Sequence, residues 1–178
     1  MPRRICVKGT SGAGKSTFGK ELAERLDVPF IELDTLHWGP NWSLPEDEVF
    51  RARVCAAMAA CSSGWVIDGN HDSKLGGTVI DAVDTIVWLD LPLRITLPRL
   101  WRRTMYRLRN DIELPGGNRE TWRGHFASRE SLFIWAVRAR RKHRRLWPER
   151  FGNDPRLVRL RSDAEALRWL ATQHESGR

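Results

Sequence analysis

The sequence is poor in cysteine, in lysine and in long apolar runs, and these shortages exclude several kinds of protein. Its 178 residues include three cysteines, Cys6, Cys55 and Cys61, without C-x-x-C spacing, so neither a disulfide framework nor a zinc site is expected. The longest uncharged apolar run, Val54 to Cys61, has eight residues, whereas a membrane-spanning helix needs roughly 18. Only Ile5 to Val7 follows the first two arginines, which is too short for a secretory signal. These absences predict a cytoplasmic protein that has no membrane partner.

Basic side chains are concentrated in the second half of the chain. Residues 1–89 carry 9 basic and 12 acidic side chains, and residues 90–178 carry 21 and 10, so the net charge of +8 is the sum of −3 and +11. Of the 30 basic residues, 25 are arginines, whose planar guanidinium matches phosphate and carboxylate oxygens. This pattern indicates an anionic partner and leaves open whether it is a nucleotide, a nucleic acid or another polyanion.

Short apolar runs alternate with helical patterns along the chain. Five strands are predicted, at residues 5–7, 30–34, 65–68, 85–90 and 157–160. Helices are predicted between them, and a capping box formed by Ser162 and Glu165 begins the last one. Residues 110–124 are the one long irregular stretch. The alternation predicts a single α/β domain over residues 1–178, with helices on both faces of a parallel sheet.

The segment after the first strand has the Walker A pattern, Gly-x-x-x-x-Gly-Lys-Ser, at residues 9–16. Its glycines let successive N–H groups point at phosphate oxygens, and the helix that follows adds its positive N-terminal end. Lys15 is expected to reach the β and γ phosphates, and the Ser16 hydroxyl to bind Mg²⁺. The motif therefore predicts binding of a nucleoside triphosphate with Mg²⁺ by Gly9, Thr10, Ser11, Gly12, Ala13, Gly14, Lys15, Ser16 and Thr17.

Two absences narrow the class of phosphate-loop protein. The chain has neither an Asp-x-x-Gly nor an Asn-Lys-x-Asp segment, which are the switch and base-reading elements of GTPases. It is also too short for the additional domains of helicases and large oligomeric ATPases. The class that remains is a small kinase.

Three aspartates come at the ends of predicted strands, and ligands of doubly wound sheets bind at that edge. Asp34 is predicted to orient an acceptor hydroxyl or take its proton, and Asp68 is predicted to hold Mg²⁺. Asp90 precedes Leu91-Pro92, which is typical of a structural stop, although a metal role for Asp90 in place of Asp68 stays open. The acceptor pocket is predicted to include Asp34, His37, Trp38, Gly69 and Asn70.

Arginines of the second half are candidates for neutralising the charge of phosphoryl transfer. Arg99 and Arg103 are four residues apart and therefore share one face of a predicted helix. Arg119 and Arg123 lie in the irregular stretch 110–124, which is predicted to be a hinged lid. The predicted catalytic set is thus Lys15, Asp34, Arg103, Arg119 and Arg123. A denser basic run at residues 138–145 is expected to be a solvated face, with docking of a polyanion as the alternative.

These segments together resemble the nucleoside monophosphate kinases, and more closely the adenylate-kinase-related proteins labelled DNA topology modulation proteins. The resemblance rests on the Walker motif, on residues 33–38, on Asp68-Gly69-Asn70, and on Leu89 to Pro92 followed by the spaced arginines. It implies a three-layer fold with five parallel strands in the order 2-3-1-4-5, ATP with Mg²⁺, and an arginine-bearing lid. It further implies that Arg99 faces the adenine, that Arg103 faces the phosphates, and that Arg119 or Arg123 enters from the lid.

The acceptor side departs from that family. Asp68 to Asp72 reads Asp-Gly-Asn-His-Asp, where monophosphate kinases have Asp-Gly-Phe-Pro-Arg, so the arginine that clamps an acceptor phosphate is missing. Asp34 with His37 also resembles the acceptor motif of gluconate- and shikimate-type kinases. The leading hypothesis is a kinase for a small molecule or nucleotide, and the alternatives are a nucleic-acid-associated ATP-binding regulator and a nucleotide-binding protein that has lost turnover. The acceptor, the nucleoside base and the oligomeric state stay open.

Overall fold

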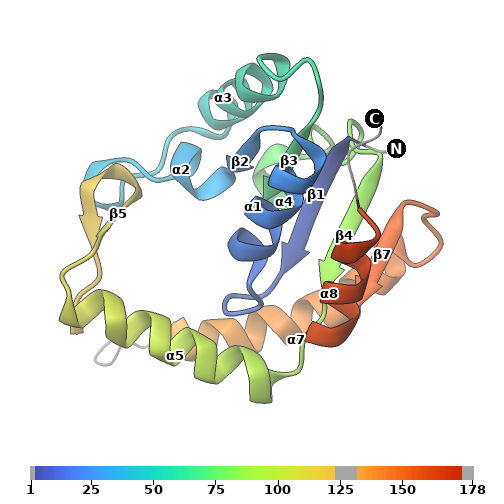
Figure 1. The fold of residues 1–178 in the computed structure, drawn as a ribbon. Helices are drawn as coiled ribbons and strands as arrows, with labels where there is room; N and C mark the ends of the chain where they lie inside the picture. The colour runs from blue at the N-terminus through green and yellow to red at the C-terminus, as the bar shows by residue number, and fades with distance from the viewer. Residues whose placement is uncertain (1–2, 123–131, 174–178) are drawn as a thin grey trace.

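A computed structural model describes residues 3–122 and 132–173 of the chain, and its centre is a five-stranded parallel sheet (Figure 1). The strands lie in the order β2-β3-β1-β4-β7, which confirms the predicted order. Their bounds are β1 Arg4–Gly9, β2 Phe30–Glu32, β3 Trp65–Asp68, β4 Thr85–Leu89 and β7 Leu157–Leu160. The predicted strand at 30–34 is too long, because the chain turns at Leu33 into a short helix that contains Asp34.

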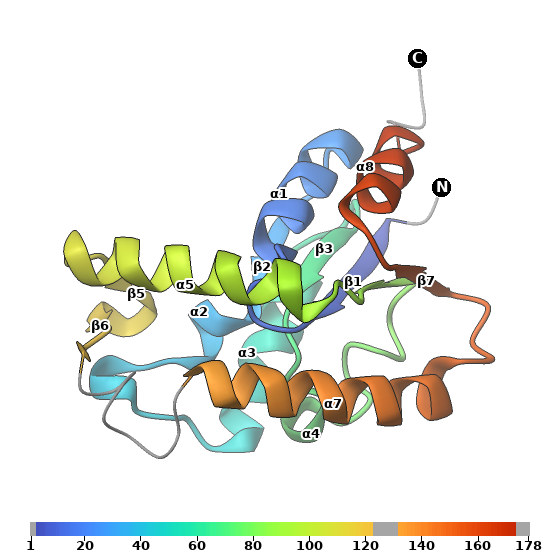
Figure 2. The same ribbon diagram turned by 90° about the horizontal axis from the view of Figure 1, so that it is seen from below.

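Helices cover both faces of the sheet. Figure 2 shows α1 and α8 on one side of the strands and α4 and α7 on the other. The helices are α1 Lys15–Leu26, α2 Leu33–His37, α3 Asp47–Ala59, α4 Asp72–Leu75, α5 Leu93–Arg109, α7 Leu132–Phe151 and α8 Asp163–Ala171. No helix in the described ranges is long and apolar enough to cross a membrane.

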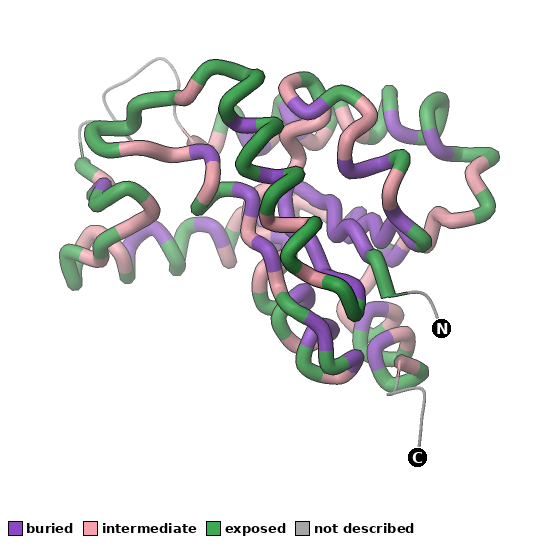
Figure 3. Tube along the Cα trace, turned by 90° about the horizontal axis from the view of Figure 1, so that it is seen from above, coloured by how far each residue is buried: buried purple, intermediate pink, exposed green. Residues whose placement is uncertain are grey.

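The central strands are buried along most of their length (Figure 3), and their alternating side chains contribute to two separate hydrophobic clusters. In β1, Ile5 and Val7 pack with α1 and α8, whereas Cys6 packs with the layer that contains Phe50 and Trp147. Successive side chains of a strand point to opposite faces, so Lys8 lies on the Cys6 face. Lys8 is only 1% exposed, which places an ammonium group inside the core next to the Walker loop.

The stretch predicted to be an irregular lid contains a small hairpin in its described part. Strands β5 (Glu113–Leu114) and β6 (Asn118–Arg119) pair antiparallel around the 3-10 turn η2 (Pro115–Gly117). The buried Asn118 side chain donates to the carbonyls of Gly39 and Pro115, at 2.8 and 2.6 Å, and accepts from the Trp42 N–H at 2.7 Å. These bonds attach the hairpin to the turn η1 (Pro40–Trp42), which follows α2.

Candidate active site

The Walker loop joins β1 to α1 and leaves its amides available for a ligand. Gly12 and Gly14 have φ values of +82° and +86°, which non-glycine residues rarely adopt. The Ala13 N–H donates to the Thr10 carbonyl at 3.0 Å and closes the turn. Among the described residues, the amides of Gly12, Gly14 and Lys15 have no hydrogen-bond acceptor. Unpaired amides at a helix N-terminus are a ready site for phosphate.

Gly12 also lets α5 approach the loop. A Cβ atom at this position would lie 2.2 Å from the Thr96 carbonyl oxygen and 3.2 Å from the Leu100 Cβ atom. This close contact places the arginine face of α5 beside the Walker motif. A cavity of about 750 Å³ lies between them, lined by Gly12 to Phe18, Glu32, Arg99, Arg103, Arg107, Pro115 and residues of α8. The predicted residue Thr17 lines it, whereas the structure gives Thr10 a buried position behind the loop.

Ser16 and Asp68 form one corner of this site. The Ser16 hydroxyl donates to Asp68 Oδ2 at 2.5 Å, and Glu32 Oε1 lies 3.3 Å from the same hydroxyl. Asp68 Oδ1 is buried without a hydrogen-bond partner, and burial raises the pKa of Asp68 despite the opposing effects of Lys15 and Ser16. An unsatisfied buried carboxylate oxygen next to a hydroxyl fits a bound cation. Among the described residues, no group of three or more acidic, histidine or cysteine side chains is placed to hold a metal ion.

Asp90 has a different environment from Asp68. Its carboxylate is buried and accepts from Arg159 at 2.6 Å, and Arg140 and Arg144 lie 3.7 and 3.6 Å away. These arginines come from β7 and α7, so Asp90 joins the sheet to the helix behind it. Between the two aspartates that the sequence left open, the geometry favours Asp68 for the metal.

On the acceptor side, Asp34 projects from α2 toward the loop after β3. Asp34 Oδ1 lies 2.9 Å from His71 Nε2, and Asp34 interacts electrostatically with Lys15. Burial raises the pKa of Asp34, but the His71 hydrogen bond and the neighbouring positive charges outweigh burial and hold this pKa below its usual value. Asp34 is therefore ionised at neutral pH.

His37 and Trp38 line the floor and edge of this region. His37 is buried, and its ring lies 4.8 Å from Phe50, 5.0 Å from Trp38 and 4.3 Å from His71 between centroids. Burial, with the electrostatic effect of His71, lowers the pKa of His37 to about 4. His37 is thus a neutral packing residue beneath Asp34, whereas the half-buried Trp38 stacks edge-on against Trp42.

Gly69 and Asn70 have packing and hydrogen-bonding partners within the protein, and their contact with an acceptor stays a prediction. A Cβ atom on Gly69, whose φ is +151°, would lie 2.9 Å from the Leu33 side chain, so this glycine permits close packing of α2. Asn70 Nδ2 donates to the Gly9 carbonyl at 2.6 Å, and Asn70 Oδ1 accepts from the Gly9 N–H at 3.3 Å. Asn70 therefore pins the loop after β3 to the start of the Walker loop.

The predicted arginines occupy unequal positions. Arg103 faces the cavity and interacts electrostatically with Asp34 and Asp68. Arg99 lines the cavity too, but both of its terminal nitrogens bond to Asp163 of α8, at 3.0 and 2.8 Å. Arg119 pairs with Asp111 within the lid segment and is not among the residues that line the cavity, so its role in phosphoryl transfer stays a prediction. Arg123 lies outside the described residues.

The sequence predicts that the basic run of α7 is a solvated face, but in the structure only part of this run is exposed. Arg140 is largely buried and donates to the Leu91 carbonyl at 3.0 Å, in addition to facing Asp90. Arg144 faces Asp90 as well, and Arg150 lies 3.8 Å from Asp72. These three arginines hold α7 against the sheet, while Arg138, Arg141 and Arg145 are exposed.

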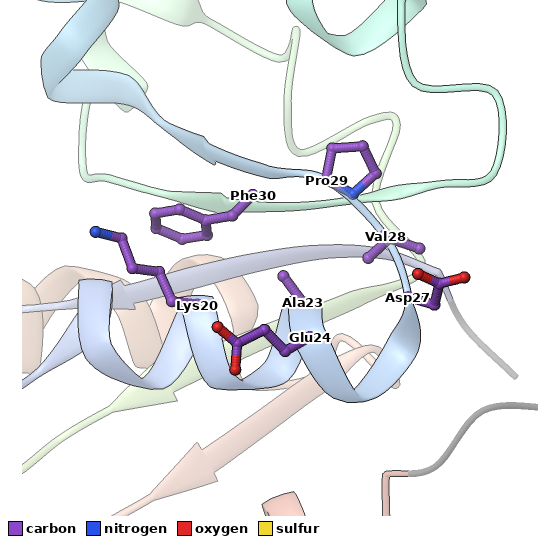
Figure 4. A pocket seen from close by; sticks show the side chains of 7 residues that line it. All are labelled: Lys20, Ala23, Glu24, Asp27, Val28, Pro29 and Phe30. Atoms are coloured by element: carbon purple, nitrogen blue, oxygen red, sulfur yellow. The ribbon is translucent and has the colours of Figure 1, made fainter.

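A second hollow, of about 440 Å³, lies between the end of α1 and the start of β2 (Figure 4). Its acidic residues, Glu24 and Asp27, are exposed, and Lys20 Nζ lies 5.8 Å from the centre of the Phe30 ring. This hollow contains neither the Walker amides nor the aspartates described above. The chemistry therefore belongs to the cavity at the Walker loop.

A family model described as AAA domain matches residues 5–121, which include the Walker loop, both site aspartates and the arginines of α5. The chain belongs to this AAA domain family. It is 27% identical over 146 residues to the uncharacterized protein YqaC of Bacillus subtilis, covering 80% of this chain and 81% of YqaC. It is also 30% identical over 127 residues to the shikimate kinase of Rippkaea orientalis, covering 62% and 65% of the two chains.

Two solved structures have the same fold as this chain. A gluconokinase from Sinorhizobium meliloti superposes with a TM-score of 0.54 and 24% identity, over 96% of this chain and 92% of the other. The shikimate kinase of Bacteroides thetaiotaomicron gives the same TM-score at 17% identity, over 96% and 95%. The prediction of a P-loop kinase is confirmed at the level of family and fold. The adenylate-kinase or topology-modulation subtype and the nucleic-acid alternative gain no support from these comparisons.

Three residues around this site were not selected from the sequence: Lys8, His71 and Asp72. Lys8 Nζ bonds to Asp72 Oδ1 at 2.5 Å. Asp72 directly follows His71, the residue that contacts Asp34. Two features of the sequence could have indicated this pair: Lys8 lies inside an apolar strand, and the Asp72 carboxylate comes two residues after Asn70. Their pairing depends on the register of β1 and β3, which the sequence pattern alone does not supply.

Proposed function

We propose that this protein transfers the γ-phosphoryl group of ATP to a hydroxyl group of a small molecule, with Mg²⁺ as cofactor. One arrangement carries the proposal: Lys15, Ser16 and Arg103 line one cavity, and the Ser16 hydroxyl donates to Asp68 at 2.5 Å. Both cations also act electrostatically on Asp34 and Asp68. Phosphoryl transfer requires cations for the transferred group, one carboxylate for the metal and another for the acceptor.

In this proposal, each group has a distinct task. The Walker amides and Lys15 bind the phosphates, and Arg103 stabilises the negative charge of the transferred group. Ser16 and Asp68 hold Mg²⁺, which neutralises phosphate charge when bound. The acceptor oxygen forms a bond to the γ-phosphorus while the bond to the β–γ bridging oxygen breaks, and ADP leaves. The hydroxyl proton passes to Asp34.

The names of the relatives guide the choice of acceptors. Shikimate kinase and gluconokinase are named for small hydroxylated acids, so shikimate and gluconate are the first acceptors to test. Nucleoside monophosphates have lower priority, because no arginine occupies positions 68–72.

The experiment measures ADP release in the presence of a panel of acceptors. With Lys15→Ala, we expect a large loss of ATP affinity, and with Asp34→Asn we expect ATP binding to persist while kcat falls by about 10²- to 10⁴-fold. Lys142→Ala and Asp81→Asn are matched controls, because both residues are exposed and lie outside the cavity. If no acceptor raises ADP release by the wild-type protein above its rate in water, the proposal is wrong.

A further inference from the structure

The loop after β3 is fixed on both sides of His71. On one side, Asn70 makes two hydrogen bonds to the backbone of Gly9. On the other, Asp72 bonds to the buried ammonium of Lys8, and Asp72 Oδ2 lies 3.8 Å from Arg150. His71 is thus held between two anchors that connect it to the strand leading into the Walker loop.

Packing fixes the ring of His71 as well. Its centroid lies 4.3 Å from that of His37 and 5.4 Å from that of Phe50, and the rings are tilted relative to one another. In this orientation His71 Nε2 meets Asp34 Oδ1 at 2.9 Å. The His71 side chain is 18% exposed and that of Asp34 is 56% exposed, so Asp34 remains accessible on its other side.

The protonation of this pair follows from the chemistry of its members. Asp34 is ionised at neutral pH, and an ionised carboxylate can only accept hydrogen bonds. His71 Nε2 must therefore be the donor, whichever charge the ring carries. Asp34 Oδ1 is occupied by this bond, and Oδ2 is left for an incoming hydroxyl.

We propose that His71 is a positioning residue that orients Asp34 toward the acceptor hydroxyl. This inference rests on the proposed function and adds a residue to it. His71 restricts rotation of the carboxylate by holding one oxygen, and so directs the other oxygen at the acceptor. Restricting a reacting group in this way lowers the barrier because its orientation is set before the reaction begins.

The surrounding charges are compatible with this role. Asp34 and His37 face His71 from α2, and Lys15 and Arg103 act on Asp34 from α1 and α5. Asp47 of α3 and Lys74 of α4 act on His37, whose pKa of about 4 leaves it neutral. The His37 ring beneath the pair therefore contributes packing without carrying a positive charge at neutral pH.

The test compares two substitutions of similar size. His71→Gln can place an amide donor close to the position of Nε2, whereas the shorter His71→Asn cannot reach Asp34. Lys142→Ala is the control, because Lys142 is exposed on α7 and does not line the cavity. The readouts are ¹³C NMR titration of the Asp34 carboxyl, affinity for ATP, and the pH profile of kcat with any acceptor that the panel identifies.

We expect His71→Asn to raise the pKa of Asp34, to lower kcat by about 10- to 100-fold, and to leave the KM for ATP unchanged. Its acidic limb in the pH profile should move to higher pH, and His71→Gln should restore kcat to within about threefold of wild type. An unchanged Asp34 titration in His71→Asn, or equal kcat in the Asn and Gln variants, overturns the proposal. If the wild-type protein phosphorylates no acceptor, the proposed function fails, and the titration still decides whether His71 holds Asp34.

Discussion

The buried pair of Lys8 and Asp72 gives the most specific prediction about stability. Lys8 is 1% exposed and Asp72 is 17% exposed, and their charged atoms are 2.5 Å apart. Asp72 has a second cation nearby, Arg150 at 3.8 Å, whereas the further contact of Lys8 within residues 3–122 and 132–173 is the face of Trp147, at 5.8 Å from the ring centre. Substitution of Asp72 should therefore lower the free energy of unfolding more than substitution of Lys8.

The expected magnitudes follow from this asymmetry. Asp72→Asn leaves a fully buried ammonium without a counter-charge and should lower the free energy of unfolding by about 3–5 kcal/mol. Lys8→Met keeps the side-chain length and leaves Asp72 with Arg150 and partial solvent, so its cost should be about 1–3 kcal/mol. The double variant buries no unpaired charge, and the two changes should couple by about 2 kcal/mol.

Urea unfolding followed by circular dichroism at pH 7 measures all three values. For a chain of this size, Asp72→Asn should also lower Tm by roughly 10 °C. Equal losses in the two single variants, or losses that simply add in the double variant, would refute the reasoning. Either result would mean that the ammonium of Lys8 reaches solvent or another partner.

Three further predictions test other parts of the site. Gly12→Ala places a Cβ atom 2.2 Å from the Thr96 carbonyl at a φ of +82°, so it should lower stability by about 2 kcal/mol or more and weaken ATP binding, as measured by urea unfolding and titration calorimetry. Asp90→Asn should lower the free energy of unfolding by about 3 kcal/mol, because it leaves the surrounding arginines unpaired. Its Mg²⁺ dependence should stay as in the wild type, and loss of that dependence would mean that Asp90 holds the metal. Burial lowers the pKa of His143 to about 4, below the usual 6.5, so it contributes stability above pH 6.5 that is lost as the pH falls toward 4. His143→Phe should keep the stacking on Trp147, at 4.1 Å, and flatten this part of the stability profile, measured by urea unfolding from pH 7.5 to 4.5.

The parts of the fold that local chemistry determines could be predicted from the sequence. Buried apolar strands alternate with helices, and this alternation yielded the parallel sheet, while the family resemblance supplied its order. The Ser162 cap is a local motif, and the structure shows Ser162 Oγ accepting from the Glu165 N–H at 3.2 Å. The Walker loop was predictable for the same reason, since its glycines, lysine and serine act at fixed spacing.

Roles that depend on contacts between distant segments could not be predicted in the same way. Arg99 and Arg103 share a helix face, but only the structure shows that Arg99 is engaged by Asp163, 64 residues away. Arg119 was assigned to the triphosphate because it lies in a polar loop, and its nearest carboxylate turned out to be Asp111 in the same segment. In both cases an arginine has an acidic neighbour that spacing along the chain does not identify.

The loop after β3 shows how these long-range contacts determine a site. Asn70 is the polar residue of this loop that the sequence assigns to an acceptor, yet its side chain bonds to Gly9, and Asp72 bonds to Lys8 of the same strand. Because β1 and β3 are adjacent and parallel, the register that pairs Val7 with Asp68 also brings Asn70 to Gly9, whereas Asp72 reaches Lys8 because the chain turns into α4 after the end of β3. His71, between these anchors, is then the member of the loop that meets Asp34. A substitution in β1 that shifts this register should therefore impair the acceptor side as well as the Walker loop.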